Sequence, residues 1–422
     1  MRALLVWLHR WTGLIMAGFL VIIGLTGSLL AFNTELERIF APQLFAKPHP
    51  GQEKLDLAML AERAEALLPA KPRMLGISYT EPDQVLVYFL LPDDPATDAP
   101  YKVGFDELYL DPWTGAELGH RTRADLSEGL INLMPFIYIL HYRLAMGDTV
   151  MFVFGLVAIA WTLDCFVAFY LTLPPTFTQF WRRWKGAWRI KRGAGFFRLN
   201  FDLHRASGLW LWPMLFVFAW SSVALNIRPA FEWPMRQLFD YRPRQEAEAY
   251  MMRQATTPRN LDWRAALARG ETLMREQAAL HGATIKQPLM LFYDADANVY
   301  SYEARGSRDL FERSPKGGST SVAFDGGDGA LIEFSQPTGE HLGNTIEAWL
   351  VTLHMARIFG LPYKVFVSFL GLVVAMLSVT GIYIWWKKRA ARRHAASHRK
   401  RAAGQSFGVV VARRNSWATR RE

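Results

Sequence analysis

Cysteine is almost missing from this 422-residue sequence, which contains only Cys165. One thiol cannot form a disulfide framework, a CxxC redox pair or a cysteine-held iron–sulfur cluster, so these three kinds of site are excluded. A dinucleotide-binding turn is missing as well. The glycine-rich stretch "KRGAGFFR" (191–198) lacks the preceding strand, the spacing and the following acidic residue that such a turn needs. Nothing in the sequence therefore indicates a nicotinamide or flavin site.

Charged side chains are almost absent from four long apolar runs. These runs are Trp11–Phe32, Thr149–Leu173, Ser207–Ile227 and Val365–Trp386. A helix needs about 20 apolar residues to cross a hydrocarbon core about 30 Å thick, so each run is expected to span a membrane. Asp164 in the second run and Pro213 in the third can be accommodated by neighbouring helices. The first run is too long for the apolar core of a cleaved secretory signal, so we interpret it as a span.

Acidic residues are scarce in two segments that flank these spans. Residues 174–205 carry eight Lys or Arg against Asp202 alone, and residues 387–422 carry twelve against Glu422 alone. Basic loops remain in the cytoplasm, so both segments and both termini are expected inside the cell. This topology accounts for most of the net charge of +10. We expect the basic segments to face anionic membrane lipid and expect no nucleic-acid partner.

The expected fold is a membrane α-helical protein with four transmembrane helices. The predicted order is span 1–32, periplasmic domain 33–148, span 149–173, cytoplasmic loop 174–206, span 207–227, periplasmic domain 228–364, span 365–386 and cytoplasmic tail 387–422. Each periplasmic domain is expected to include a helix lying at the membrane interface. The Asp-to-Gly spacing of Asp111 and Gly115 recurs at Asp325 and Gly329 between apolar arms, which predicts matching hairpin turns. We therefore expect two pseudo-symmetric halves, each with one α+β domain.

Histidine recurs at matching points of the two halves. "LHRWTG" contains His9 and "LHRASG" contains His204, and each opens a span. His141 and His354 lie 26 and 25 residues beyond the two turn glycines, in short apolar stretches ahead of the second and fourth spans. Two parallel repeats would be related by an axis along the membrane normal. Such an axis brings His9 towards His204 on the cytoplasmic side and His141 towards His354 on the outer side.

Two facing imidazoles are what a six-coordinate haem iron requires from a protein. A zinc or copper site would need further ligands, which the sequence does not supply near His9 or His204. We therefore expect the four histidines to ligate two haem irons. The alternatives are interfacial histidines with ordinary hydrogen bonds, or a proton pathway.

Small and basic residues follow the histidines. Gly13 and Gly208 lie four residues after His9 and His204 on the same helix face, and they lack a side chain that would block a flat macrocycle. Small residues also serve ordinary helix packing in membranes. Four arginines are placed to pair with haem propionates or with lipid phosphates. These are Arg10, Arg205, Arg143 and Arg357.

The motifs "LHRWTG", "LHRASG" and "LYLDPWTGAEL", with the two Leu-His pairs, resemble the PepSY-associated transmembrane proteins up to about Lys388. This family includes bacterial inner-membrane reductases that act on ferric siderophores such as ferrioxamine. The resemblance implies two haem b groups, a ferric siderophore as the periplasmic substrate, and a donor such as quinol or reduced flavin. "FDGGDGAL" in the second half departs from the family's Asp-Pro-x-Thr-Gly turn.

A second class of function remains open at this point. The chain could be a non-catalytic membrane adaptor or sensor whose periplasmic domains bind a partner. Its histidines would then act in pH sensing, because the charge of histidine changes near neutral pH. A haem absorption band separates the two, since the adaptor predicts none.

Overall fold

The protein is described here by a computed structural model. The described residues are 1–94, 99–101, 103–191, 193–243, 248–255, 257–310 and 318–418, with side chains described up to residue 395. The chain divides into two compact units. One comprises 1–22, 160–215 and 373–422, and the other comprises 23–159 and 216–372.

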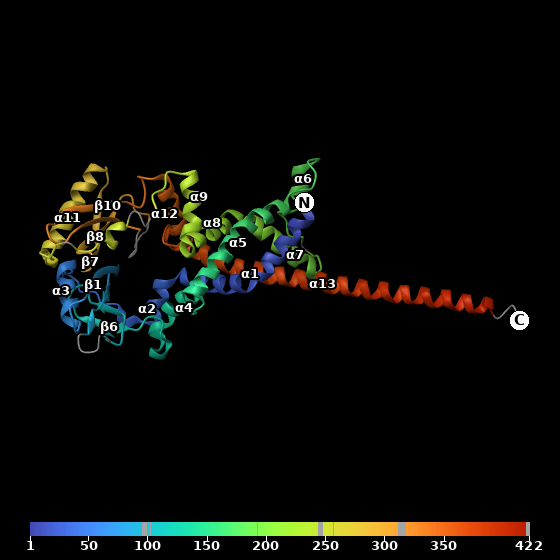
Figure 1. Ribbon diagram of the computed structural model, residues 1–422, viewed down its shortest axis with the longest axis horizontal. Helices are drawn as coiled ribbons and strands as arrows, with labels where there is room; N and C mark the ends of the chain where they lie inside the picture. Colours follow the sequence, from blue (N-terminus) through green and yellow to red (C-terminus); the bar gives the residue numbers. More distant parts are fainter. Residues whose placement is uncertain are drawn as a thin grey trace. The chain divides into compact units, whose positions relative to one another are not determined.

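Among the described residues, three helices are long and apolar enough to cross a membrane. Figure 1 labels all three. They are α1 (Arg2–Leu30), α5 (Asp148–Thr172) and the first part of α13 (Gly360–Ala418). Their apolar segments coincide with the first, second and fourth expected spans. The basic tail continues α13, and the described helix extends to Ala418.

The third expected span is a broken helix. It consists of α7 (Phe196–Trp210) and α8 (Trp212–Asn226), which meet at an angle of 71°. Pro213 explains the break, because proline has no N–H to donate to the carbonyl of Leu209 and its ring crowds the preceding turn. Helix α7 also begins eleven residues before Ser207, so the end of the expected cytoplasmic loop is helical.

The second unit contains an eight-stranded antiparallel sheet in the order β10-β9-β8-β7-β1-β2-β5-β6. Its strands are β1 (Met74–Glu81), β2 (Gln84–Leu90), β5 (Glu107–Leu110), β6 (Glu117–Arg121), β7 (Ile285–Asp294), β8 (Val299–Gly306), β9 (Thr320–Asp325) and β10 (Leu331–Ser335). Strands β3 (Asp93–Asp94) and β4 (Ala99–Pro100) form a separate short pair. The two halves thus meet at β1 and β7, where Gly76 opposes Phe292. Where we expected two separate α+β domains, the strands form one sheet.

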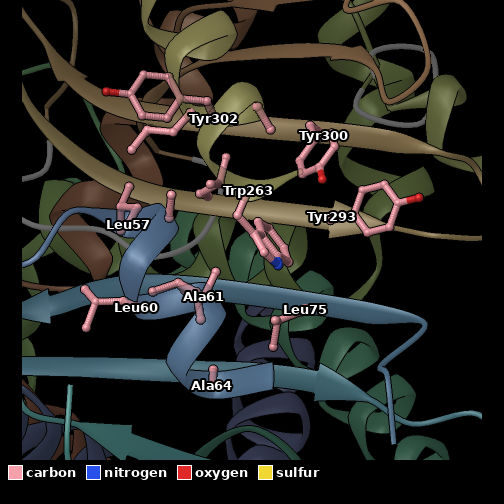
Figure 2. Close-up of a cluster of buried hydrophobic side chains, with 14 of the residues drawn as sticks. Leu57, Leu60, Ala61, Ala64, Leu75, Trp263, Tyr293, Tyr300 and Tyr302 are labelled. Atoms are coloured by element: carbon pink, nitrogen blue, oxygen red, sulfur yellow. The ribbon is translucent and has the colours of Figure 1, made fainter. Parts of the chain in front are cut away.

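Helices α3 (Leu57–Leu67) and α11 (Trp263–Leu280) pack on the same face of this sheet, as the expected repeat requires. Asp56 and Asp262 cap them by accepting hydrogen bonds from backbone N–H groups three residues ahead. Figure 2 shows their shared core. Trp263 meets the ring of Tyr300 edge-on at 5.5 Å, and Leu60 of the first half belongs to the same buried cluster. One hydrophobic core therefore serves both halves.

The two expected turns are present between β5 and β6 and between β9 and β10. Gly115 and Gly329 have φ of +69° and +71°, a conformation that glycine adopts without strain. Their N–H groups donate to the carbonyls of Asp111 and Asp325. The sequence change to "FDGGDGAL" therefore keeps the turn.

Short helices complete the fold. They are α2 (Asn33–Phe40), α4 (Leu133–Arg143), α6 (Phe180–Trp184), α9 (Arg228–Leu238) and α12 (Leu342–His354), with 3₁₀ turns η1 (Pro42–Leu44), η2 (Leu126–Glu128), η3 (Leu130–Asn132) and η4 (Ala249–Met252). Helices α4 and α12 end at or just after His141 and His354. Both histidines therefore lie in last helical turns close to the start of an apolar helix.

Candidate functional site

The first unit brings His9 and His204 together. His9 projects from α1 and His204 from α7, and their ring centres lie 6.2 Å apart with the ring planes inclined by 60°. The two residues are 195 positions apart in the sequence. The pairing expected from the repeat is therefore present in the structure.

Both rings of this pair are anchored through Nδ1. The His9 Nδ1 lies 3.0 and 2.9 Å from the two carboxylate oxygens of Asp164 in α5. The His204 Nδ1 lies 3.0 Å from the carbonyl oxygen of Leu377 and 3.1 Å from the hydroxyl of Thr380, both in α13. A carboxylate and a carbonyl can only accept a hydrogen bond, so Nδ1 carries the proton in both rings. This tautomer leaves a lone pair on each Nε2.

The second unit brings His141 of α4 and His354 of α12 together in the same way. Their ring centres lie 6.3 Å apart with an interplanar angle of 71°. The ring of Phe218 stacks on His354 at 4.8 Å and limits its rotation. The two pairs, one in each unit, thus share nearly the same ring separation.

Hydroxyl groups anchor the Nδ1 atoms of this second pair. Thr26 Oγ1 lies 3.0 Å from His141 Nδ1, and Ser221 Oγ lies 2.7 Å from His354 Nδ1. Each hydroxyl also reaches a carbonyl of its own helix, at 3.4 Å for Thr26 and 3.1 Å for Ser221. The hydroxyl proton has an acceptor there, so its oxygen is free to accept from Nδ1–H. We assign the same tautomer to all four histidines on this basis.

The observed ring separations match two histidines bound to opposite sides of one metal ion. Metal–nitrogen bonds to histidine are about 2.0–2.1 Å long. A nitrogen lies about 1.1 Å from the centre of a five-membered ring with bonds of about 1.33 Å. Two such bonds in line place the ring centres about 6.3 Å apart. Ordinary edge-on ring pairs also have centre separations of about 4.5–7 Å, so the separation alone does not identify a metal site. The hydrogen bonds that hold all four Nδ1 atoms are the second observation, because metal-bound histidines are usually held in this way.

Four glycines bear on the histidines: two leave open space on the helices of His9 and His204, and two contact the rings of His141 and His204. A Cβ at Gly13 would meet no atom within 4 Å, and one at Gly208 would meet only a methyl group of Leu377 at 3.8 Å. Space is therefore open at these two glycines, which a flat group beside the rings would need. Two further glycines lie against the rings themselves. A Cβ at Gly27 would lie 3.0 Å from His141 Cε1, and one at Gly381 would lie 3.3 Å from His204 Cε1.

The four arginines differ in their surroundings. Among the described residues, Arg10 forms no hydrogen bond or ion pair, so its guanidinium is available to an anionic group. Arg205 donates to the Asp202 carboxylate and to the Gly186 carbonyl, both at 2.8 Å.

The other two arginines follow the second histidine pair. Arg143 lies 3.4 Å from the Asp148 carboxylate. Burial lowers the pKa of Arg357, and the nearby charge of Glu81 opposes that shift. Arg143 and Arg357 each stand within three residues of a paired histidine, so both remain candidates for an anionic group there.

A conventional metal centre is not built from these residues. In the described part of the chain, no group of three or more His, Cys, Asp or Glu side chains could hold a metal ion. Each histidine pair offers two ligands, so a cofactor that brings its own four in-plane nitrogens fits the donor set. The residues present therefore fit haem.

Sequence reasoning missed the anchoring residues, although one had a visible signal. Asp164 is the single acidic residue in the four apolar runs, and an ionisable group in a span marks a functional site by default. Thr26, Ser221 and Thr380 gave no such signal, because buried hydroxyls in membrane helices commonly bond their own helix. Their role depends on which helix packs against them.

Helices long and apolar enough to cross a membrane, together with two facing imidazole pairs, define a membrane protein with two paired-histidine sites. Residues 6–388 match the family model of the PepSY-associated TM region, and the chain belongs to this family. The match covers all four histidines. Among curated proteins, none matches the chain.

Proposed function

We propose that the protein binds two haem b groups and carries electrons across the bacterial inner membrane to a ferric siderophore in the periplasm. The observation that carries the proposal is the recurrence of one geometry in both units: two imidazoles 6.2–6.3 Å apart, each with Nδ1 anchored. Anchored Nδ1 atoms are the usual outer-shell arrangement of metal-bound histidines.

Haem, when bound, supplies a one-electron relay through the ferrous and ferric states of its iron. The residues of the chain would hold it in place. His9 with His204, and His141 with His354, would each hold one haem iron. Gly13 and Gly208 would leave room for the macrocycle. Arg10, Arg143, Arg205 and Arg357 would pair with propionates.

Placement in the inner membrane with cytoplasmic termini rests on the basic segments 174–205 and 387–422. The His9–His204 pair would then lie on the cytoplasmic side and receive electrons from quinol or reduced flavin. The His141–His354 pair belongs to the unit that carries the sheet, which would face the periplasm. Hard oxygen ligands of a siderophore hold ferric iron more strongly than ferrous iron, so reduction would release the metal.

The first experiment measures haem in the full-length protein purified in detergent. We expect a Soret band and two haems per chain by pyridine haemochrome. His9→Ala and His204→Ala should remove the same haem, and His141→Ala and His354→Ala should remove the other. The exposed His281, whose ring bonds a carbonyl of its own helix, gives the matched control His281→Ala, which should keep both. Protein without a Soret band, or four variants with unchanged counts, would favour the adaptor or sensor function.

The second experiment tests the substrate class. Protein reduced with dithionite under anaerobic conditions should be reoxidised faster by a ferric siderophore than by buffer alone in stopped-flow spectra. His354→Ala should lose most of this acceleration, because it removes the site in the sheet-bearing unit. Equal rates with and without the ferric siderophore in the wild-type protein would show that the substrate is a different one.

A further inference from the structure

The two histidine pairs differ in the charge of the groups that anchor them. His9 Nδ1 donates to both oxygens of the Asp164 carboxylate, at 3.0 and 2.9 Å. The Nδ1 atoms of His141 and His354 donate to the neutral hydroxyls of Thr26 and Ser221. The anchoring side chains in both pairs are buried, so the difference is not one of solvent exposure.

In the part of the chain that the structure describes, Asp164 is bound to its histidine and to no Lys or Arg side chain. Among the described residues, His9 is its ion-pair partner, and neither Arg2 nor Arg10 pairs with it. Its negative charge is therefore not neutralised by a neighbouring arginine. Arginines follow both histidine pairs closely in the chain, so each pair has cationic neighbours, whereas a carboxylate anchors only His9 among the four histidines.

A carboxylate acceptor changes the metal-binding power of the ring that it holds. It draws the Nδ1 proton and raises the electron density on Nε2, which makes the imidazole a stronger donor. It also places a negative charge close to the metal in a low-dielectric interior. Both effects favour the more positively charged ferric state, so they lower the reduction potential of the iron. A hydroxyl acceptor raises the electron density on Nε2 less than a carboxylate does, and it adds no negative charge near the metal.

We infer that Asp164 makes the His9–His204 site the stronger reductant of the two, so that electron transfer from this site to the His141–His354 site is favourable. The inference rests on the proposed function and adds the direction of electron transfer between the two sites. The step moves one electron and no proton: the first site is oxidised, the second is reduced, and no bond forms or breaks. Quinol or reduced flavin replaces the electron, and the ferric siderophore accepts it. Asp164 is a positioning residue that acts through His9.

The test measures the reduction midpoint of each haem in isolation. His354→Ala leaves the haem of the His9–His204 pair, and His9→Ala leaves the other. The midpoint in the His354→Ala protein should be the lower of the two. Adding Asp164→Asn should raise it, because asparagine keeps the size and an acceptor oxygen but removes the charge. In the His9→Ala protein the same substitution should cause no shift.

Two further variants separate charge from structure. Asp164→Glu retains the carboxylate and should keep the low midpoint, even if Asp164→Asn loses haem through misfolding. Thr380→Val removes one acceptor from His204, and it should shift the midpoint less than Asp164→Asn does, because the Leu377 carbonyl remains.

Two results would overturn the inference. One is a His9–His204 midpoint at or above that of the other pair, and the other is a midpoint that Asp164→Asn leaves unchanged. Two haems per wild-type chain alongside either result would leave the proposed function standing. A wild-type chain without haem would overturn both.

Discussion

Gly27 lies directly against the ring of His141, and this contact predicts a selective loss of haem. In Gly27→Ala the new Cβ would lie 3.0 Å from Cε1, 3.6 Å from Nδ1 and 3.9 Å from Nε2 of that ring. Carbon atoms pack at about 3.5–4.0 Å, so the ring must retreat by about 0.5 Å. Metal–ligand distances tolerate about 0.2 Å. The variant is therefore expected to bind the haem of the His141–His354 pair about 10- to 100-fold more weakly.

Two other glycines turn this prediction into a graded series. At Gly381 the added Cβ would lie 3.3 Å from His204 Cε1, which asks for a retreat of about 0.2 Å. Gly381→Ala should therefore weaken the haem of the His9–His204 pair only slightly. At Gly18 an added Cβ would meet no atom within 4 Å, so Gly18→Ala is the matched control on α1.

The assay is haem titration into apoprotein, followed by absorption and by haem count per chain. Gly27→Ala should affect one haem only, Gly381→Ala the other, and Gly18→Ala neither. Circular dichroism of each apoprotein checks that the helices are intact. If Gly27→Ala binds both haems as tightly as Gly18→Ala does, the ring of His141 is not an iron ligand held in the position described.

Two predictions concern the sheet. Arg121 is buried and donates a hydrogen bond to the buried Glu107. Arg121→Leu should therefore destabilise the sheet-bearing unit by about 3–5 kcal/mol and lower its thermal midpoint. Loss of the exposed Arg264 is the control and should leave the midpoint unchanged. Burial raises the pKa of Asp83, but the hydrogen bond and charge of Arg38 outweigh it and lower the pKa below 3.8. A carboxylate with a lowered pKa stabilises the fold above about pH 4, and this stabilisation is lost as the pH falls further. Asp83→Asn should therefore reduce the loss of stability at acid pH, measured by unfolding followed through tryptophan fluorescence. An identical acid dependence in the wild type and the variant would contradict the Arg38–Asp83 pair.

The sequence predicted those parts of the molecule that depend on local pattern. The four apolar runs and the two turn glycines each act within a few residues of their own position. The histidine pairs were also within reach, because the repeat supplied a symmetry that related distant positions. The internal repeat therefore predicted which distant histidines lie close together.

The remaining features depend on tertiary packing, which a single sequence does not encode in any local pattern. Thr26 and Ser221 become anchors only because α4 and α12 bring histidines against them. The break after Trp210 reflects Pro213, which a neighbouring helix in a membrane can equally accommodate without a break. The joining of two expected domains through β1 and β7 depends on edge strands, and strand alternation does not reveal which edges pair.

The central strand pair also determines whether either half can exist alone. β1 and β7 would each become an open edge if the chain were divided between the repeats, with rows of unpaired N–H and C=O groups. Trp263 and Leu60 would lose their shared packing in the same cut. A separated half would therefore tend to pair with a second copy of itself through that edge.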